Sequence, residues 1–202
     1  MKISLQNAGK RFNRDWIFRH LTIEFAATGS YAITGANGSG KSTLLQVLAG
    51  ATMHSEGQLV YQSENGKPVE QPYKSIAIAA PYLELIEELT ATELIDFHAG
   101  FKNLTAPVSD ILASVNLDKA AHKQIRYFSS GMKQRLKLAQ AFFSESEVLF
   151  LDEPTTNLDS EGTALYQNLV KNHAGNRLLI VSSNVPEEYV FCGEVVRMED
   201  FK

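Results

Sequence analysis

The sequence predicts an α/β fold with a mixed sheet, an antiparallel β edge formed by the N-terminal part, and an inserted helical subdomain. Three observations lead to this prediction. An apolar run at residues 31–34 precedes a glycine-rich turn and a helical pattern at residues 44–49. A fully apolar run at residues 148–151 is typical of a central parallel strand that is buried on both faces. Residues 90–123 carry a helical pattern throughout.

Composition limits the classes of protein that fit. A chain of 202 residues with 44% hydrophobic and 21% charged residues suits one domain, or one core with a small subdomain. The net charge of −4 argues against a dedicated nucleic-acid surface, because phosphate contacts need clustered Lys and Arg. No signal-peptide pattern opens the sequence, and no apolar run approaches the roughly 20 residues that span a bilayer. We therefore expect a cytoplasmic protein without direct membrane insertion.

The expected elements follow the chain in order. Strands are predicted at residues 3–6, 21–25, 31–34, 58–61, 67–69, 76–80 and 178–181, with a loop at residues 10–12. Asn65-Gly66 predicts a hairpin, and Gly50 a helix C-cap. Thr90 and Glu93 have the spacing of a capping box. We expect one domain, with an α/β core at residues 1–80 and 144–202 and the helical subdomain at residues 81–143.

The glycine-rich turn has the spacing of the phosphate-binding P-loop, G-x-x-x-x-G-K-[ST]. Its residues, all expected to bind the phosphates, are Gly35, Ala36, Asn37, Gly38, Ser39, Gly40, Lys41, Ser42 and Thr43. Glycines let successive N–H groups point at an anion, and the helix N-terminus adds about half a unit charge. Lys41 is expected to reach the β- and γ-phosphates, and Ser42 to ligate Mg²⁺. The sequence therefore predicts a protein that binds a nucleoside triphosphate.

Two acids follow the apolar run at residues 148–151. Ligands of parallel sheets bind at the carboxyl ends of strands, where Asp152 and Glu153 fall. In a P-loop protein this is the Walker B position. Asp152 is expected to hold the metal, and Glu153 to face the water that attacks the γ-phosphate.

A further motif lies about twenty residues before this strand. The segment from Tyr127 to Ala141 contains Phe128-Ser129-Ser130-Gly131-Met132-Lys133-Gln134-Arg135 and resembles the signature motif of the ATP-binding cassette (ABC) family. The resemblance covers nearly the whole chain, because Phe12, the P-loop, the helical insertion, Walker B and a D-loop ending at Asp159 come in the family's order.

The resemblance implies how the parts work. The signature (Ser129, Ser130, Gly131) and Asp159 of one cassette would close over ATP held by a second cassette, in a head-to-tail homodimer or heterodimer. Phe12 would stack on adenine, with Trp16 as the competing aromatic residue. The cofactors would be ATP and Mg²⁺. The partners would be integral membrane transporter subunits, with the protein peripheral on the cytoplasmic face of the cell membrane.

The chain departs from the family at three places. No glutamine occurs between Gln71 and Gln124, where the family has its Mg²⁺-sensing glutamine. No histidine follows His173, so Ser183 or Asn184 stands at the switch position, and we expect Ser183 to be catalytic together with Glu153. Ser130 and Met132 replace the more usual glycine and glutamine of the signature. We therefore expect hydrolysis to be retained but slow.

Three functions fit this pattern. The first is the ATP-hydrolysing subunit of an ABC transporter that drives separate membrane subunits. The second is a soluble, non-transport ABC protein. The third is a slow or non-hydrolysing regulatory ATP-binding module, which the missing glutamine and histidine keep open.

Overall fold

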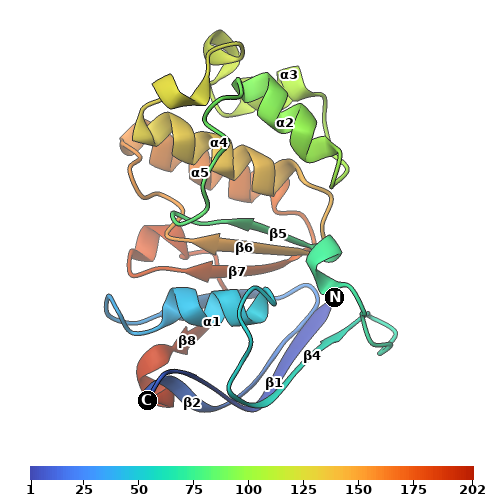
Figure 1. Ribbon diagram of the computed structural model, residues 1–202, viewed down its shortest axis with the longest axis vertical. Coiled ribbons are helices and arrows are strands. Elements are labelled where there is room, and N and C mark those ends of the chain that lie inside the picture. The colour runs from blue at the N-terminus through green and yellow to red at the C-terminus, as the bar shows by residue number, and fades with distance from the viewer. The chain divides into compact units, whose positions relative to one another are not determined.

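The computed structural model describes residues 1–202, and Figure 1 shows its strands and helices. The chain divides into two compact units. The first comprises Met1–Ile76, Ser146–Asp152 and Asn176–Lys202, and the second comprises Ala77–Glu145 and Glu153–Gly175. Strands make up the frame of the first unit, and helices make up most of the second. The predicted α/β class with an antiparallel β edge is confirmed.

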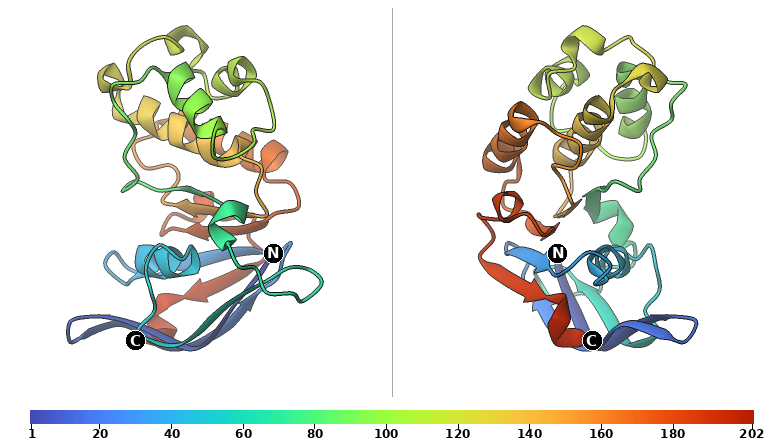
Figure 2. Two further views of the ribbon diagram at one scale, coloured as in Figure 1. Left: turned by 45° about the vertical axis from the view of Figure 1, so that its right-hand side comes forward. Right: turned by 90° about the vertical axis from the view of Figure 1, so that its left-hand side faces the viewer.

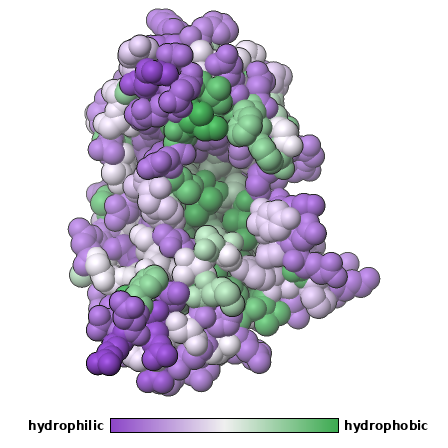
Figure 3. All heavy atoms as spheres, viewed as in Figure 1, coloured by the Kyte–Doolittle hydropathy of each residue, from purple (hydrophilic) through white to green (hydrophobic).

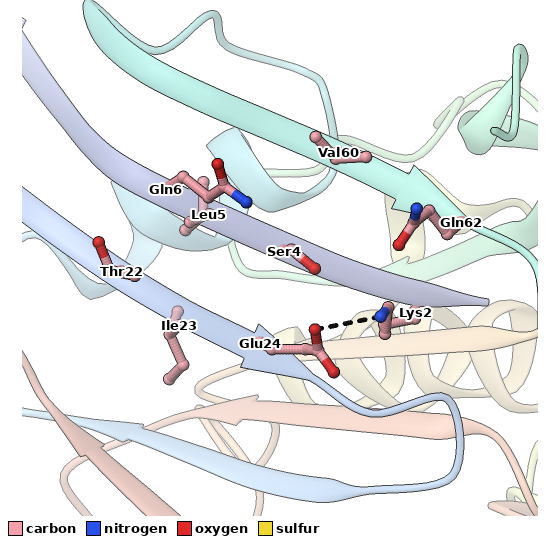
Figure 4. Close-up of a pocket in the computed structure, with 9 residues that line it drawn as sticks. All are labelled: Lys2, Ser4, Leu5, Gln6, Thr22, Ile23, Glu24, Val60 and Gln62. Carbon is pink, nitrogen blue, oxygen red and sulfur yellow. Dashed lines mark ion pairs between the residues drawn. The ribbon is translucent and has the colours of Figure 1, made fainter. Parts of the chain in front are cut away.

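An antiparallel sheet forms one layer of the first unit. It contains β1 (Lys2–Phe12), β2 (Asp15–Phe25) and β4 (Glu56–Gln62) in the order β2-β1-β4. Ile3 and Leu5 are fully buried, whereas the neighbouring polar residues face the other way, as the two-residue period of a strand requires. Figure 4 shows the residues that line a hollow here, among which Lys2 pairs with Glu24 at 3.1 Å. The sheet therefore has one core face and one solvated face.

The strand β1 is longer than the sequence predicts. The loop expected at residues 10–12 is its last part, paired with β2 through Lys10, Arg11 and Phe12. The pairing shifts register between Leu5 and Lys10, and Asn7 takes a positive φ of 44°. Such bulges interrupt the alternation of apolar and polar residues that marks a strand in sequence. The hairpin predicted at Asn65-Gly66 is confirmed by the antiparallel pairing of β4 with residues 68–69.

A parallel sheet forms the second layer of this unit. Within it, β6 (Val148–Asp152), β7 (Leu178–Ser182), β3 (Ser30–Thr34) and β8 (Glu194–Arg197) lie in that order. Every residue of β6 and β7 is buried, as expected for central strands. The helix α1 (Lys41–Leu48) packs on β6 and β7 and ends before Gly50, which has the positive φ of the predicted cap. The carboxyl ends of β3, β6 and β7 thus share one edge.

The second unit is a group of packed helices. The strand β5 (Ile76–Ala79) leads into it, and its helices are α2 (Ala91–Ala99), α3 (Val108–Ser114), α4 (Ser130–Phe143) and α5 (Ser160–His173). Helix α4 packs against α2, α3 and α5, and Figure 2 shows these helices from two sides. No helix in the structure is both long and apolar enough to cross a bilayer. The chain also contains five 3-10 turns, at Pro72–Ser75, Asp118–Ala120, Ile125–Tyr127, Pro186–Glu188 and Met198–Phe201.

The expectation of helix throughout residues 90–123 is wrong. Helix α2 ends at Ala99 with Gly100 as its C-cap, residues 101–107 are not helical, and α3 begins at Val108 directly after Pro107, a position where the missing N–H of proline is tolerated. Figure 3 shows hydrophobic residues at the surface over these helices. The side chains of Phe97 on α2 and of Phe101 just after it are exposed, and their ring centroids lie 5.2 Å apart. This aromatic pair is an apolar surface within a mostly polar unit.

The capping box gives a stability prediction. The Thr90 hydroxyl accepts the Glu93 N–H at 3.2 Å, and the Glu93 carboxylate accepts the Thr90 N–H at 2.8 Å. Replacing Thr90 by alanine should lower the free energy of unfolding by about 1 kcal/mol in urea titrations, since the N-terminus of α2 loses its cap. Thr28→Ala, at an exposed turn, is the control and should change it by less than about 0.5 kcal/mol. Equal effects of the two substitutions would contradict the capping role.

The Glu93 carboxylate accepts the Thr90 N–H at 2.8 Å and also the Thr90 hydroxyl at 2.9 Å, and these two bonds lower the pKa of Glu93 because they stabilise its charged form. The stabilisation is therefore present above the ordinary pKa of a glutamate and is lost as the pH falls through the lowered value. The difference in the free energy of unfolding between Thr90→Ala and the unchanged protein should accordingly become smaller in acid.

Candidate functional site

The turn between β3 and α1 has a backbone that only glycine adopts easily. Gly35, Gly38 and Gly40 have φ angles of +143°, +77° and +102°. A Cβ atom on Gly40 would lie 2.3 Å from Ile17 Cγ2, and one on Gly35 would lie 2.7 Å from Ser39 Oγ. The spacing of glycines in the motif is therefore a requirement of this chain's own geometry.

The turn offers hydrogen-bond donors to an anion. Lys41 is 4% exposed, and its ammonium donates to the carbonyls of Gly35 at 2.9 Å and Ala36 at 3.4 Å. Gly40 caps α1 without any side-chain bond, so no side chain occupies the positive end of the helix. The hydroxyl of Ser39 is buried without a hydrogen-bond partner. A phosphate would give the Ser39 hydroxyl a hydrogen-bond partner and would place negative charge at the N-terminus of α1.

Residues distant in sequence hold the turn from outside. The Asn184 amide donates to Asn37 Oδ1 at 2.7 Å, and the Lys202 ammonium donates to the Ser39 carbonyl at 2.9 Å. Sequence reasoning missed the contact of Lys202. No local signal points to it, because 163 residues separate the two partners.

Asp152 and Glu153 differ in their surroundings. Asp152 closes β6, is 1% exposed and stands in register with Ser182 of β7, whose buried hydroxyl has no hydrogen-bond partner. Glu153 is half-buried and has a φ of 43°, a strained conformation for a residue with a side chain. The hydroxyl of Thr156 donates to its carboxylate at 3.5 Å. Backbone strain of this kind clusters at functional sites, which favours a chemical role for Glu153.

The signature residues form the start of α4. Ser129 is the N-cap, with its side chain accepting the Met132 N–H at 3.2 Å, while Ser130 is exposed. A Cβ atom on Gly131 would lie 3.0 Å from the Asn157 carbonyl, so glycine allows the helix to approach the loop after Walker B. The buried Gln134 strengthens the same contact by donating to the Pro154 carbonyl at 2.8 Å. The N-terminal end of α4 thus packs against the segment that contains Asp159.

Asp159 has a local role in the structure. Its carboxylate caps α5 by accepting the Gly162 N–H at 2.8 Å. One carboxylate oxygen carries this bond, and an ionised carboxylate can accept several. The capping role is compatible with the predicted contact to a second cassette, which stays a prediction.

The two aromatic candidates of the N-terminal hairpin have different environments. Phe12 is 49% exposed, with the Lys10 ammonium 4.6 Å from its ring centroid. Trp16 lies near two guanidinium groups, those of Arg11 at 5.4 Å and Arg19 at 4.3 Å. Both rings therefore have a cation against them, and Phe12 is the more exposed of the two because Trp16 is half-buried.

A lysine contacts the region where the family's glutamine is expected. Lys137 of α4 donates to the carbonyls of Ala80 at 3.3 Å and Pro81 at 2.8 Å. Burial lowers the pKa of Lys137, with a further contribution from Lys133. The backbone of this segment is therefore held by a side chain of α4, an arrangement that the sequence alone does not indicate.

The strand, glycine-rich turn and helix, with the buried Lys41 and with Asp152 as the last residue of β6, define a P-loop nucleotide-binding protein. Comparison with known protein families identifies the family within this class. The family model described as "ABC transporter" matches residues 18–156, and the chain belongs to this family. The protein therefore has an ATPase domain of the ABC type that binds adenine nucleotides.

Named relatives and a solved structure agree with this assignment. The chain is 28% identical to the ABC transporter ATP-binding protein YybJ of Bacillus subtilis, over 97% of this chain and 92% of that protein. It is 30% identical to the cytochrome c biogenesis ATP-binding export protein CcmA of Mesorhizobium japonicum, over 92% and 93%. A dimeric ATP-binding cassette solved with ADP and Pi has the same fold, with a TM-score of 0.80, 20% identity and coverage of 96% and 93%.

The glycines of the turn give a second prediction. Gly40→Ala should lower the free energy of unfolding more than Gly38→Ala in urea titrations. Both positions have a positive φ, but only a Cβ at Gly40 meets another atom, Ile17 Cγ2 at 2.3 Å, while one at Gly38 meets nothing within 4 Å. The strained φ alone costs about 1 kcal/mol at either site, and the difference between the two measures the clash. Equal losses would show that the turn moves away from Ile17 freely.

Proposed function

We propose that this protein is the ATP-binding and ATP-hydrolysing subunit of an ABC transporter, and that it drives separate membrane subunits. The buried Lys41, in a turn that also holds the buried and unpaired hydroxyl of Ser39, is the observation that carries the proposal. Binding of ATP would replace the two carbonyl contacts of Lys41 by contacts to phosphate oxygens, which are stronger because both partners are charged.

Mg²⁺ would bind with the nucleotide rather than before it. The structure contains no group of three or more His, Cys, Asp or Glu side chains that could hold a metal alone. Mg²⁺ commonly takes one or two protein ligands together with substrate phosphates. The hydroxyl of Ser42 and the buried carboxylate of Asp152 fit this mode.

Glu153 is the proposed general base, which would take a proton from the attacking water. Ser183 is the residue that we assign to the switch position, although its hydroxyl accepts the Val185 N–H at 2.8 Å. Neither Ser183 nor Asn184 can bring a positive charge to the γ-phosphate. With no glutamine between Gln71 and Gln124 as well, we propose that hydrolysis is slow. A regulatory module that hydrolyses no ATP is the alternative.

The proposed active form is a head-to-tail dimer. In each copy Ser129, Ser130 and Gly131 would contact ATP bound to the other copy or to a related cassette, and Asp159 would lie at the interface. The exposed Ser130 at the N-terminus of α4 supports this proposal, because backbone N–H groups there suit an anion. The solved cassette of the same fold with ADP and Pi is itself a dimer.

The proposed membrane partners are integral transporter subunits. The relatives are an ABC transporter ATP-binding protein and an ATP-binding export protein, and no helix of this chain could span a bilayer. The exposed aromatic pair Phe97 and Phe101 offers an apolar surface for contact with another protein. A soluble, non-transport ABC protein is the other alternative, and co-purification with an integral membrane protein separates the two.

Nucleotide binding tests the central claim. Lys41→Ala should weaken binding of a fluorescent ATP analogue by at least tenfold in equilibrium titrations, since a charge-assisted contact contributes about 1.5–3 kcal/mol. Lys67→Ala, in the hairpin after β4, is the matched control and should bind as the unchanged protein does. Equal affinities of the Lys41→Ala variant and the control would remove Lys41 from the site.

Two measurements on a Glu153 variant test the catalytic role of Glu153 and the proposed dimer. Glu153→Gln should reduce phosphate release by about 10²–10⁴-fold, the usual contribution of a general base, while ATP binding is kept. Sizing with ATP should then show a trapped dimer. Equal rates of phosphate release in both proteins would remove Glu153 from the catalytic role, and a monomer at high protein and ATP concentrations would contradict the dimer. No phosphate release by the unchanged protein would favour the regulatory module.

A further inference from the structure

The loop after β7 leaves the parallel sheet beside the P-loop. Strands β3 and β7 are parallel neighbours in which Ile33 pairs with Ser182, and the Ser183 N–H donates to the Ile33 carbonyl at 3.1 Å. The loop that begins at Ser183 is therefore fixed next to the end of β3, from which the P-loop starts.

The two polar residues of this loop face different surroundings. Ser183 is fully buried, and its hydroxyl accepts the Val185 N–H at 2.8 Å, which closes a local turn. Asn184, the middle residue of the turn, is exposed. The turn thus keeps the hydroxyl of Ser183 inside and presents the amide of Asn184.

The Asn184 amide reaches the P-loop itself. Its Nδ2 donates to Asn37 Oδ1 at 2.7 Å, although 147 residues separate the two asparagines in sequence. Asn37 lies between Gly35 and Gly38, the glycines with positive φ. Glycines widen the choice of backbone conformations in this part of the chain, because glycine tolerates many more than other residues do. The hydrogen bond from Asn184 to Asn37 therefore restricts the backbone conformation of this glycine-rich segment.

We infer that Asn184 is a positioning residue for nucleotide: through Asn37 it holds the P-loop in the conformation that receives the phosphates. The inference rests on the proposed function. It assigns to Asn184 a contact with Asn37 rather than with the γ-phosphate. It therefore predicts that replacing Asn184 lowers the affinities for ATP and for ADP equally. The pair acts as one unit, because removing either amide removes the same bond.

A double-mutant cycle tests the inference. Asn184→Ala, Asn37→Ala and the double variant should each weaken binding of fluorescent ATP and ADP analogues by about three- to tenfold, the equivalent of one hydrogen bond. The double variant should bind as weakly as either single one, because the pair shares one interaction. Asn65→Ala, in the exposed hairpin turn, is the control and should leave both affinities unchanged.

Hydrogen exchange provides a readout that does not depend on nucleotide. Without nucleotide, amides of residues 35–40 should exchange faster in Asn184→Ala than in the unchanged protein or Asn65→Ala, while urea midpoints stay equal. Unchanged amide exchange and unchanged nucleotide affinity in Asn184→Ala would overturn the inference. It would also be overturned if the fold-losses of affinity in the two single variants multiplied in the double variant. A loss confined to ATP would overturn it in favour of a direct γ-phosphate contact. If the unchanged protein binds no nucleotide, the proposed function fails, whereas faster exchange would still support the Asn37–Asn184 anchor.

Discussion

The backbone of the P-loop is the constraint on which the rest of the first unit depends. Three glycines with positive φ lie within six residues, between a buried strand and a helix that packs on β6 and β7. This conformation needs a fixed strand end on one side and a fixed helix start on the other. The central place of β3, between β7 and β8, supplies the first, and the buried residues of α1, such as Leu44 and Leu48, supply the second.

Features fixed by neighbouring residues could be predicted from the sequence. The glycine spacing of the P-loop, the capping box at Thr90 and Glu93, and the hairpin at Asn65-Gly66 each depend on side chains or φ angles only a few residues apart. The apolar runs of β6 and β7 could also be predicted, because strands buried on both faces are mostly apolar, and each run ends in one buried polar residue, Asp152 or Ser182. The family motifs added the order in which these parts occur.

Features that depend on distant partners could not be predicted. The bulges of β1 hid its last residues, since pairing with β2 overrides the local pattern there. The contacts of Lys137 with Pro81 and of Lys202 with Ser39 arise from folded geometry alone. Ser129 shows another limit, because the serine that suits a phosphate also suits a helix cap, and sequence does not separate the two roles.

The resting contacts of Lys41 have a consequence for how fast a ligand can enter. Its ammonium bridges the carbonyls of Gly35 and Ala36, two residues of the same turn. Arrival of an anion then requires one side chain to swing, not a segment to order. Little conformational entropy is lost in such an encounter. Capture can therefore proceed at rates set by diffusion and charge attraction, with no slow rearrangement of the backbone.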